Sequence, residues 1–236
     1  MDEREISERI QYFGNIAAKY GYSTVPASVV YQAFERIARL ERKGFTPIKT
    51  GLYGRVINED IVHLIKLQPL KGRDYTVWWG VSLSFIPYKW DTRLRWRRTF
   101  KSSRFALFET PFDYFSLGTA NWREREKFVA NTLHGEEYFK KTLEELWRRL
   151  EGEIDSWFGS TESLSGVLEK AREQVERKWI GPSHHPNPLM VYAFTLARLG
   201  YIEEAHIAIE KYFQLGFETS KAQENLMKAL EKISGG

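Results

Sequence analysis

A run of basic residues interleaved with aromatic rings, between Lys89 and Arg104, carries the most evident binding chemistry of the sequence. Seven cations face one acid, Asp91, so the segment holds a charge of +6. The whole 236-residue chain holds +4, and the remaining residues therefore sum to −2. Basic side chains neutralise acidic groups, and rings such as those of Trp90 and Trp96 stack on bases or fill apolar pockets.

Three interpretations of this segment remain open. It is a solvated strand face with Arg stems over Trp rings, a surface for an acidic protein partner, or a site for RNA or DNA. If Arg93, Arg95 and Arg97 lie on a strand, their guanidinium groups share one face. The binding residues predicted for either partner are Trp78, Lys89, Trp90, Arg93, Arg95, Trp96, Arg97, Arg98, Lys101 and Arg104.

The histidines and paired acids form no specific catalytic or metal-binding pattern. His63 stands between apolar residues on an expected strand, which favours a buried structural role over a ligand or base. His184 and His185 are neighbours in a Pro-rich stretch, with no further ligand at a metal-site spacing. Glu144 and Glu145 each stand four residues before an arginine, which indicates surface ion pairs.

No phosphate loop, dinucleotide fingerprint or nucleophile elbow occurs in the sequence. We therefore expect a non-enzymatic protein that uses neither a cofactor nor a metal. A pocket that joined His63, Tyr53 and Arg55 to a nearby carboxylate would argue for an enzyme instead.

The composition is that of a folded globular protein. Hydrophobic residues make up 42% and aromatic residues 15%, which supplies a sizeable core and argues against intrinsic disorder. The absence of Cys excludes disulfides, thiol catalysis and thiolate zinc sites. The N-terminus lacks the apolar part of a signal peptide and no run is long enough to span a bilayer, so we expect a cytoplasmic protein without a membrane partner.

Strand patterns follow one another between residues 52 and 85, with expected strands at Leu52–Ile57, Ile61–Gln68 and Tyr75–Phe85. Their short connections favour an antiparallel meander. The third strand has an apolar face, which we expect to pack against helices, formed by Val77, Trp79, Val81 and Leu83. Its opposite face, around Trp78, is either covered or a binding floor, and the interaction hypothesis below expects it to be open to a partner. Residues 87–91 are expected to form a loop, and one further strand is expected near Tyr114–Leu117.

Helical periodicity occupies both ends of the chain. We expect helices over residues 3–20, 26–43, 135–157, 162–179, 189–199, 202–215 and 220–233. Ser160 or Thr161 is expected to cap the fourth of these. The pair across Gly200 has the small and apolar residues of a tetratricopeptide hairpin. The fold class is therefore α+β: an antiparallel sheet of four to five strands packed with N-terminal helices over residues 1–134, then a helical region over residues 135–236, in two domains or one.

Several short motifs also occur in an informative order. They are Lys43-Gly44-Phe45, Leu52-Tyr53-Gly54-Arg55, Ile61-Val62-His63-Leu64-Ile65-Lys66-Leu67-Gln68, Trp79-Gly80-Val81, Ile154-Asp155-Ser156-Trp157-Phe158 and Leu196-Ala197-Arg198-Leu199-Gly200. In this order the chain resembles the bacterial domain of unknown function 4304 family. The resemblance implies an α+β fold with an antiparallel sheet, and it supplies no catalytic residue. It does not extend to residues 88–125.

We accordingly predict a bacterial interaction protein that presents residues 88–104 and the Trp78 face to a protein partner. A role in immunity or defence is implied only by the kind of family that the chain resembles. The alternative is an RNA- or DNA-binding module that uses the same residues.

Overall fold

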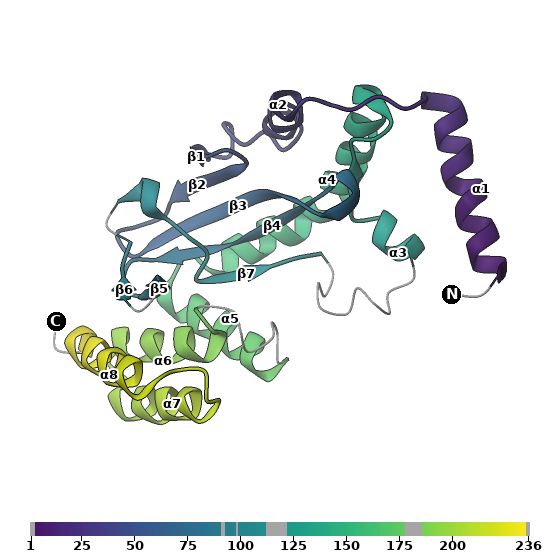
Figure 1. The fold of residues 1–236 in the computed structure, drawn as a ribbon. Helices are drawn as coiled ribbons and strands as arrows, with labels where there is room; N and C mark the ends of the chain where they lie inside the picture. The colour runs from purple at the N-terminus through teal and green to yellow at the C-terminus, as the bar shows by residue number, and fades with distance from the viewer. Residues whose placement is uncertain (1–2, 91–92, 98, 112–121, 178–185, 235–236) are drawn as a thin grey trace. The chain divides into compact units, whose positions relative to one another are not determined.

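The computed structural model describes residues 3–90, 93–97, 99–111, 122–177 and 186–234, and it has the expected α+β architecture with an antiparallel sheet (Figure 1). Within these residues the main sheet has six strands. Five follow the order β1 (Thr46–Lys49), β2 (Leu52–Val56), β3 (Ile61–Pro69), β4 (Asp74–Leu83) and β7 (Leu107–Glu109), and β8 (Ala130–Asn131) pairs with β4. A separate hairpin consists of β5 (Tyr88–Trp90) and β6 (Arg93–Arg95).

A polar turn sets the register of β2 and β3. The side-chain oxygen of Asn58 accepts the backbone N–H groups of Asp60 and Ile61 at 3.0 and 2.9 Å. This closes the turn between the two antiparallel strands and places Arg55 directly opposite His63. The expected hairpin is therefore confirmed.

Eight helices accompany the strands in the described part of the chain: α1 (Glu3–Tyr20), α2 (Ala27–Ile37), α3 (Trp122–Glu126), α4 (Gly135–Ser160), α5 (Leu164–Glu176), α6 (Pro188–Arg198), α7 (Ile202–Gln214) and α8 (Ser220–Ser234). The seven predicted helices are all present, because each has an apolar stripe to bury. The predicted cap of α5 is wrong. Its cap is Ser163, whose hydroxyl accepts the N–H of Gly166 at 3.1 Å.

The chain folds into two compact units, and each draws on three segments of sequence. The first comprises residues 1–44, 67–77 and 110–153, and the second comprises residues 45–66, 78–109 and 154–236. The chain passes from one unit to the other within β3, β4 and α4.

The core of the first unit is built from aromatic rings of α2, β4 and α4. Phe34 meets Trp147 edge to face at 6.0 Å, and Phe139 meets Tyr75 at 6.1 Å. Phe34 and Phe139 are completely buried. Each of these rings removes a large apolar area from water, which ties α2 and the start of β4 to α4.

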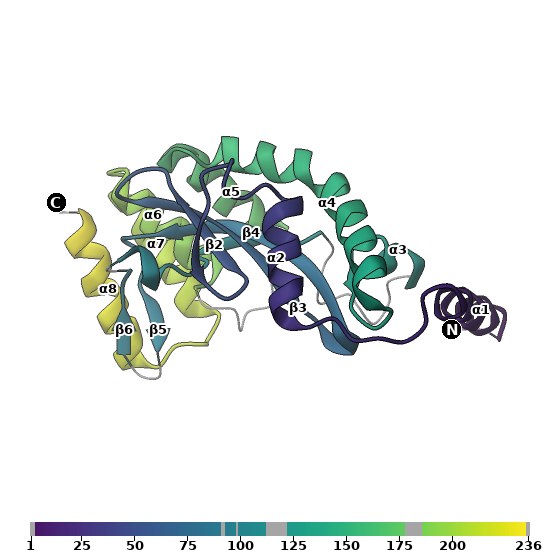
Figure 2. The same ribbon diagram turned by 90° about the horizontal axis from the view of Figure 1, so that it is seen from above.

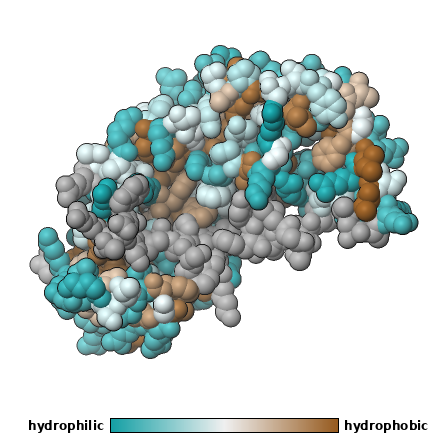
Figure 3. All heavy atoms as spheres, viewed as in Figure 1, coloured by the Kyte–Doolittle hydropathy of each residue, from teal (hydrophilic) through white to brown (hydrophobic). Residues whose placement is uncertain are grey.

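The core of the second unit centres on α6, in which eight of eleven residues are buried. It packs against α5, α7 and α8 (Figure 2). The turn into α7 passes through Gly200, whose φ of +87° favours glycine. Figure 3 shows hydrophobic residues interspersed with hydrophilic ones over these C-terminal helices.

Both faces of β4 are covered over most of its length. Val77, Trp79, Val81 and Leu83 are buried as predicted. The expectation of an open opposite face is wrong, since Thr76 and Ser82 are only 0% and 2% exposed. Trp78 is half-buried, stacks on Phe108 at 4.9 Å and has the Lys66 ammonium 5.5 Å from its ring. Neighbouring chain segments, which the sequence pattern does not reveal, cover this face.

The segment after β4 differs from its predicted structure. Tyr88–Trp90 is a strand where a loop was expected. β6 ends at Arg95, so Arg97 lies beyond it and the three alternating arginines do not share one strand. The strand expected near residues 114–117 lies outside the described residues. The very short elements β1, β7, β8 and α3 were not predicted, because periodicity needs a longer run.

The end of α2 offers a test of backbone strain. Leu40 N–H bonds to Glu35 O and Arg39 N–H to Arg36 O, a Schellman ending that places Arg39 at φ +50° where glycine is usual. Arg39→Gly is expected to raise the free energy of unfolding by about 1 kcal/mol, because glycine relieves the left-handed strain. Urea denaturation measures this change.

The matched control for that substitution is Arg36→Gly, one turn earlier and inside the helix. It should lower the free energy of unfolding by about 1 kcal/mol, since glycine is a poor helix former. A loss of stability in Arg39→Gly equal to that in Arg36→Gly would refute the strain at residue 39.

Candidate binding groove

The basic segment is organised by the β5–β6 hairpin. Tyr88 pairs with Arg95, Lys89 with Leu94, and Trp90 with Arg93. Of the predicted binding residues, Lys89, Trp90 and Arg93 are described only in their backbone, and Arg98 lies outside the described residues. Arg95, the last residue of β6, and Trp96, which follows it, are both exposed.

Three of the predicted cations contact their own chain. The Arg97 guanidinium donates to Glu59 O at 2.6 Å, and the Lys101 ammonium donates to Pro47 O at 2.7 Å. The Arg104 guanidinium lies 4.5 Å from the centre of the Tyr88 ring. Burial lowers the pKa of Arg97, and the negative charge of Asp60 opposes that shift. These three side chains contact three different parts of the chain, at Glu59, Pro47 and Tyr88, so they do not converge on one binding site.

Trp96 instead lines a groove against α8. The hairpin and α8 lie side by side in both ribbon views (Figures 1 and 2). The groove has a volume of about 710 Å³ and is lined by Ser84, Phe85, Leu94, Trp96, Asn225, Lys228, Ala229, Lys232 and Ile233. This volume lies in the usual range for ligand-binding clefts.

The groove combines an apolar floor with a positive rim. Phe85, Leu94 and Ile233 supply apolar surface, and Trp96 leaves 37% of its area exposed. Lys228 and Lys232 stand four residues apart, on the same side of α8. Among the described residues, the lining therefore holds two lysines and no carboxylate.

One of the two groove lysines, Lys228, also forms an ion pair with a carboxylate that does not line the groove. The Lys228 ammonium donates to Glu224 at 2.6 Å, and both side chains are exposed. Hydrogen bonds from Lys228 and then from Lys221 lower the pKa of Glu224 to about 2. Because this pair is open to water, a partner carboxylate competes for Lys228 at little cost.

No family model, no curated protein and no solved structure matches the chain. The groove is therefore interpreted from its own residues. The resemblance to the domain of unknown function 4304 family remains a prediction and assigns no role to any residue of the groove.

The groove residues that lie on α8 were not predicted from the sequence. Lys228, Ala229 and Lys232 follow Trp96 by more than 130 positions, and no local pattern connects such distant segments. The available signal was the pair of lysines at helical spacing beside the apolar stripe of α8. The hairpin half was recognised through Trp96, whereas Leu94 was not singled out.

His63 belongs to a second polar cluster, whose hydrogen bonds are made within the protein. The side chain is fully buried and stacks on Phe158 at 4.6 Å. Arg55 Nη2 donates to its Nδ1 at 3.1 Å, which leaves the proton on Nε2, 3.3 Å from Thr161 O. Burial, and next the Arg55 charge, lower the pKa of His63 to about 4, against the Thr161 contact.

Both nitrogens of His63 are thus bonded within the protein, and the predicted structural role of this residue is confirmed. Within the described ranges, no three His, Cys, Asp or Glu side chains gather as metal ligands. His184 and His185 lie outside those ranges. None of the described helices is long and apolar enough to cross a membrane.

Proposed function

We propose that the chain is a non-enzymatic interaction protein whose groove holds an acidic, partly apolar segment of a protein partner. The observation that carries the proposal is the groove lining, which combines apolar side chains with two lysines and, among the residues that the structure describes, contains no carboxylate. Apolar side chains of the partner would fill the floor beside Trp96 and Leu94, and its carboxylates would pair with Lys228 and Lys232. An exposed Trp beside a hollow is a typical energetic centre of a protein interface.

The alternative, a site for RNA or DNA, rests on the exposed Trp96 ring, which offers a stacking surface next to two lysines. Two features favour the protein partner. The floor continues from Trp96 into aliphatic side chains, for which a nucleic acid has no counterpart. In addition, Arg97, Lys101 and Arg104 are held by their own chain, which reduces the cations available to follow a phosphate backbone.

The groove predicts selective binding of acidic peptides. A fluorescein-labelled peptide of alternating Leu, Phe, Asp and Glu is expected to bind, as measured by fluorescence anisotropy. Trp96→Ala and the double variant Lys228→Glu/Lys232→Glu should each weaken binding by about tenfold or more, because they remove the apolar anchor or reverse the rim charge.

Lys211→Glu is the control, since it makes the same kind of charge reversal, at one position, on an exposed residue of α7 in the same unit. It should leave binding unchanged, and a peptide with Lys in place of its acids should not bind. Equal binding by the Trp96 variant and the unaltered chain would sink the proposal. Tighter binding of a labelled oligo-dT than of the acidic peptide, falling steeply with salt, would favour the nucleic-acid alternative.

A further inference from the structure

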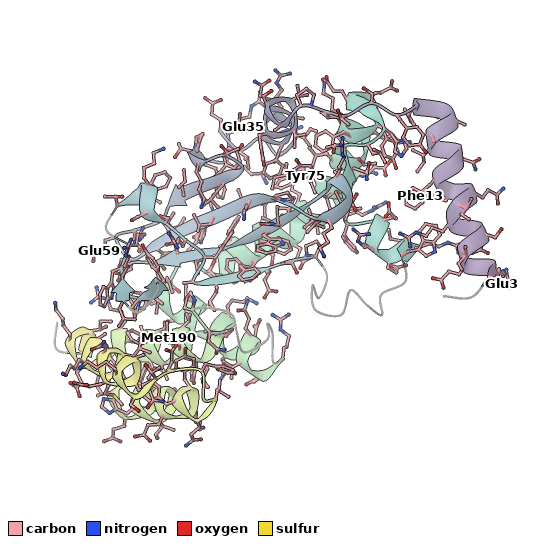
Figure 4. The ribbon with its side chains drawn as sticks, viewed as in Figure 1. Glu3, Phe13, Glu35, Glu59, Tyr75 and Met190 are labelled. Carbon is pink, nitrogen blue, oxygen red and sulfur yellow. The ribbon has the colours of Figure 1, made fainter. Side chains whose placement is uncertain are left out.

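Another hollow of the surface lies in the first unit, between α2 and α4, and we call it the α2–α4 cleft. It has a volume of about 550 Å³, enough for a small ligand, and it is lined by residues of α2, of the turn after it and of α4. Packed rings fix the two helices to each other. Phe34 of α2 meets Trp147 of α4 at 6.0 Å. Tyr75 of β4, labelled in Figure 4, contacts Tyr31 of α2 and Phe139 of α4.

The α2 side of the cleft combines aliphatic surface with two guanidinium groups. Val29, Ala33 and Ile37 recur at spacings of four along α2, so they share one side of the helix. Arg36, and Arg39 in the turn after the helix, line the same cleft. Both arginines are exposed, and neither side chain makes a hydrogen bond or ion pair with another residue that the structure describes. Two guanidinium forks are therefore open to a carboxylate.

The α4 side of the cleft carries both signs of charge. Glu136, Lys140 and Glu144 stand four residues apart, which places them on one face of the helix. Lys140 and Glu136 form an ion pair, so these two together contribute no net charge. Glu144 is exposed, and in the described part of the chain its carboxylate has no hydrogen bond or ion pair. An unpaired carboxylate thus lines the same cleft as two unpaired guanidinium groups.

Arg39 has a backbone conformation that suits glycine better. Its φ of +50° lies in the left-handed region, where an arginine costs stability. Strained residues of this kind gather at ligand sites, where the side chain is needed. The charge of Arg39 also acts on Glu151, outside the lining, but that carboxylate already pairs with Lys43 at 3.0 Å. A ligand that uses the Arg39 guanidinium accounts for an arginine at this position.

We propose that the α2–α4 cleft binds an apolar zwitterion: an aliphatic amino acid or a short aliphatic peptide with free ends. The ligand carboxylate lies between Arg36 and Arg39, its aliphatic side chains lie on the apolar surface of α2, and its ammonium group lies beside Glu144. Each unpaired charge of the cleft then has a partner of opposite sign. A phosphate ester would satisfy the arginines but would place a second anion beside Glu144. The proposal does not depend on the groove of the second unit.

Capped ligands test both ends of the zwitterion. Leu and Leu-Leu are titrated into the full chain by isothermal titration calorimetry at neutral pH, and the tighter of the two shows whether the cleft takes an amino acid or a peptide. Acetylation removes the ammonium group of that ligand and amidation removes its carboxylate. Each change should weaken binding by about tenfold or more, and inorganic phosphate should not displace the ligand.

Arg39→Gly separates binding from stability. It should weaken binding by about tenfold while it raises the urea concentration at the midpoint of unfolding, so that unfolding cannot explain the loss. Arg36→Gln should also weaken binding. Its matched control is Arg42→Gln, which makes the same change on an exposed side chain outside the lining and should keep full affinity. Glu144→Gln should weaken the free ligand but not the acetylated one, which has no ammonium group to lose.

Four results would overturn the proposal. They are the absence of binding by both Leu and Leu-Leu, a capped ligand that binds as tightly as the free one, displacement of the ligand by phosphate, and full affinity in Arg39→Gly.

Discussion

Gly80→Ala is expected to lower the free energy of unfolding by about 3 kcal/mol or more, because the added methyl group has no space. A Cβ at this position would lie 2.0 Å from Leu107 O and 2.7 Å from Phe108 Cα. Both atoms belong to the backbone of β7, which cannot rotate away as a side chain does. The variant must therefore push β7 off β4, whose pairing spans only the residues opposite Trp79, Gly80 and Val81.

Urea denaturation measures the loss of stability, and faster hydrogen exchange of the β7 amides would locate it. The control is Gly152→Ala in α4, where no atom lies within 4 Å of the added Cβ. That variant should gain stability, by about 0.5–1 kcal/mol, from the better helix former. A Gly80→Ala protein as stable as the unaltered chain would contradict the close approach of β7.

Acid is expected to destabilise the second unit through His63. The pKa of His63 is about 4 in the folded chain and near its ordinary value of 6.5 in the unfolded chain. Between these values the unfolded chain binds a proton that the folded chain does not. The stability that the neutral, buried ring contributes is therefore complete above pH 6.5 and falls as the pH decreases toward 4, by on the order of 3 kcal/mol.

His63→Gln should remove this part of the pH dependence, because its amide does not titrate and still offers a donor to Thr161 O. His206→Gln, in α7 of the same unit, makes the same substitution and should retain the acid loss. Glu126, at the end of α3, contributes with the opposite sign, because burial raises its pKa to about 7. Its raised pKa gives stability that is present below its ordinary range and is lost as the pH rises through about 7.

Because Glu126 belongs to the first unit and His63 to the second, their effects are separated by local measurements. Hydrogen exchange of the α6 amides reports on the second unit. If these amides lose protection between pH 6.5 and 4 equally in His63→Gln and in the unaltered chain, then His63 is not the group responsible.

The sequence predicted the long elements because their patterns are long. The stripe of α4 repeats over 26 residues, and the alternation in β4 covers ten. β7 and β8 have three and two residues, which is too short for a period to be recognised. Their positions depend on backbone approaches such as that of Leu107 to Gly80, which no local pattern encodes.

Only part of the candidate site was predicted from the sequence. Trp96 was singled out from charge and aromatic content, and it does line the groove. The arginines around it suggested one charged face, yet hydrogen bonds such as that from Arg97 to Glu59 O engage them. The pairing of Arg55 with His63 follows from the turn at Asn58, so it could have been predicted from the sequence. The contact of His63 with Thr161 joins residues 98 positions apart, so it could not have been predicted from a local pattern.

The division of the chain into interleaved segments has a consequence for its synthesis on the ribosome. Every residue of the first unit has been made once residue 153 is added, so contacts such as Asp74 with Asn131 can form early. The second unit must wait, because it extends to residue 236 and includes contacts such as the ion pair of Asp60 with Arg198. Until then β2 and β3 emerge with an uncovered apolar surface, a state that exposed strands make prone to aggregation. A chaperone that holds nascent chains would therefore protect this protein most while its last third is being translated.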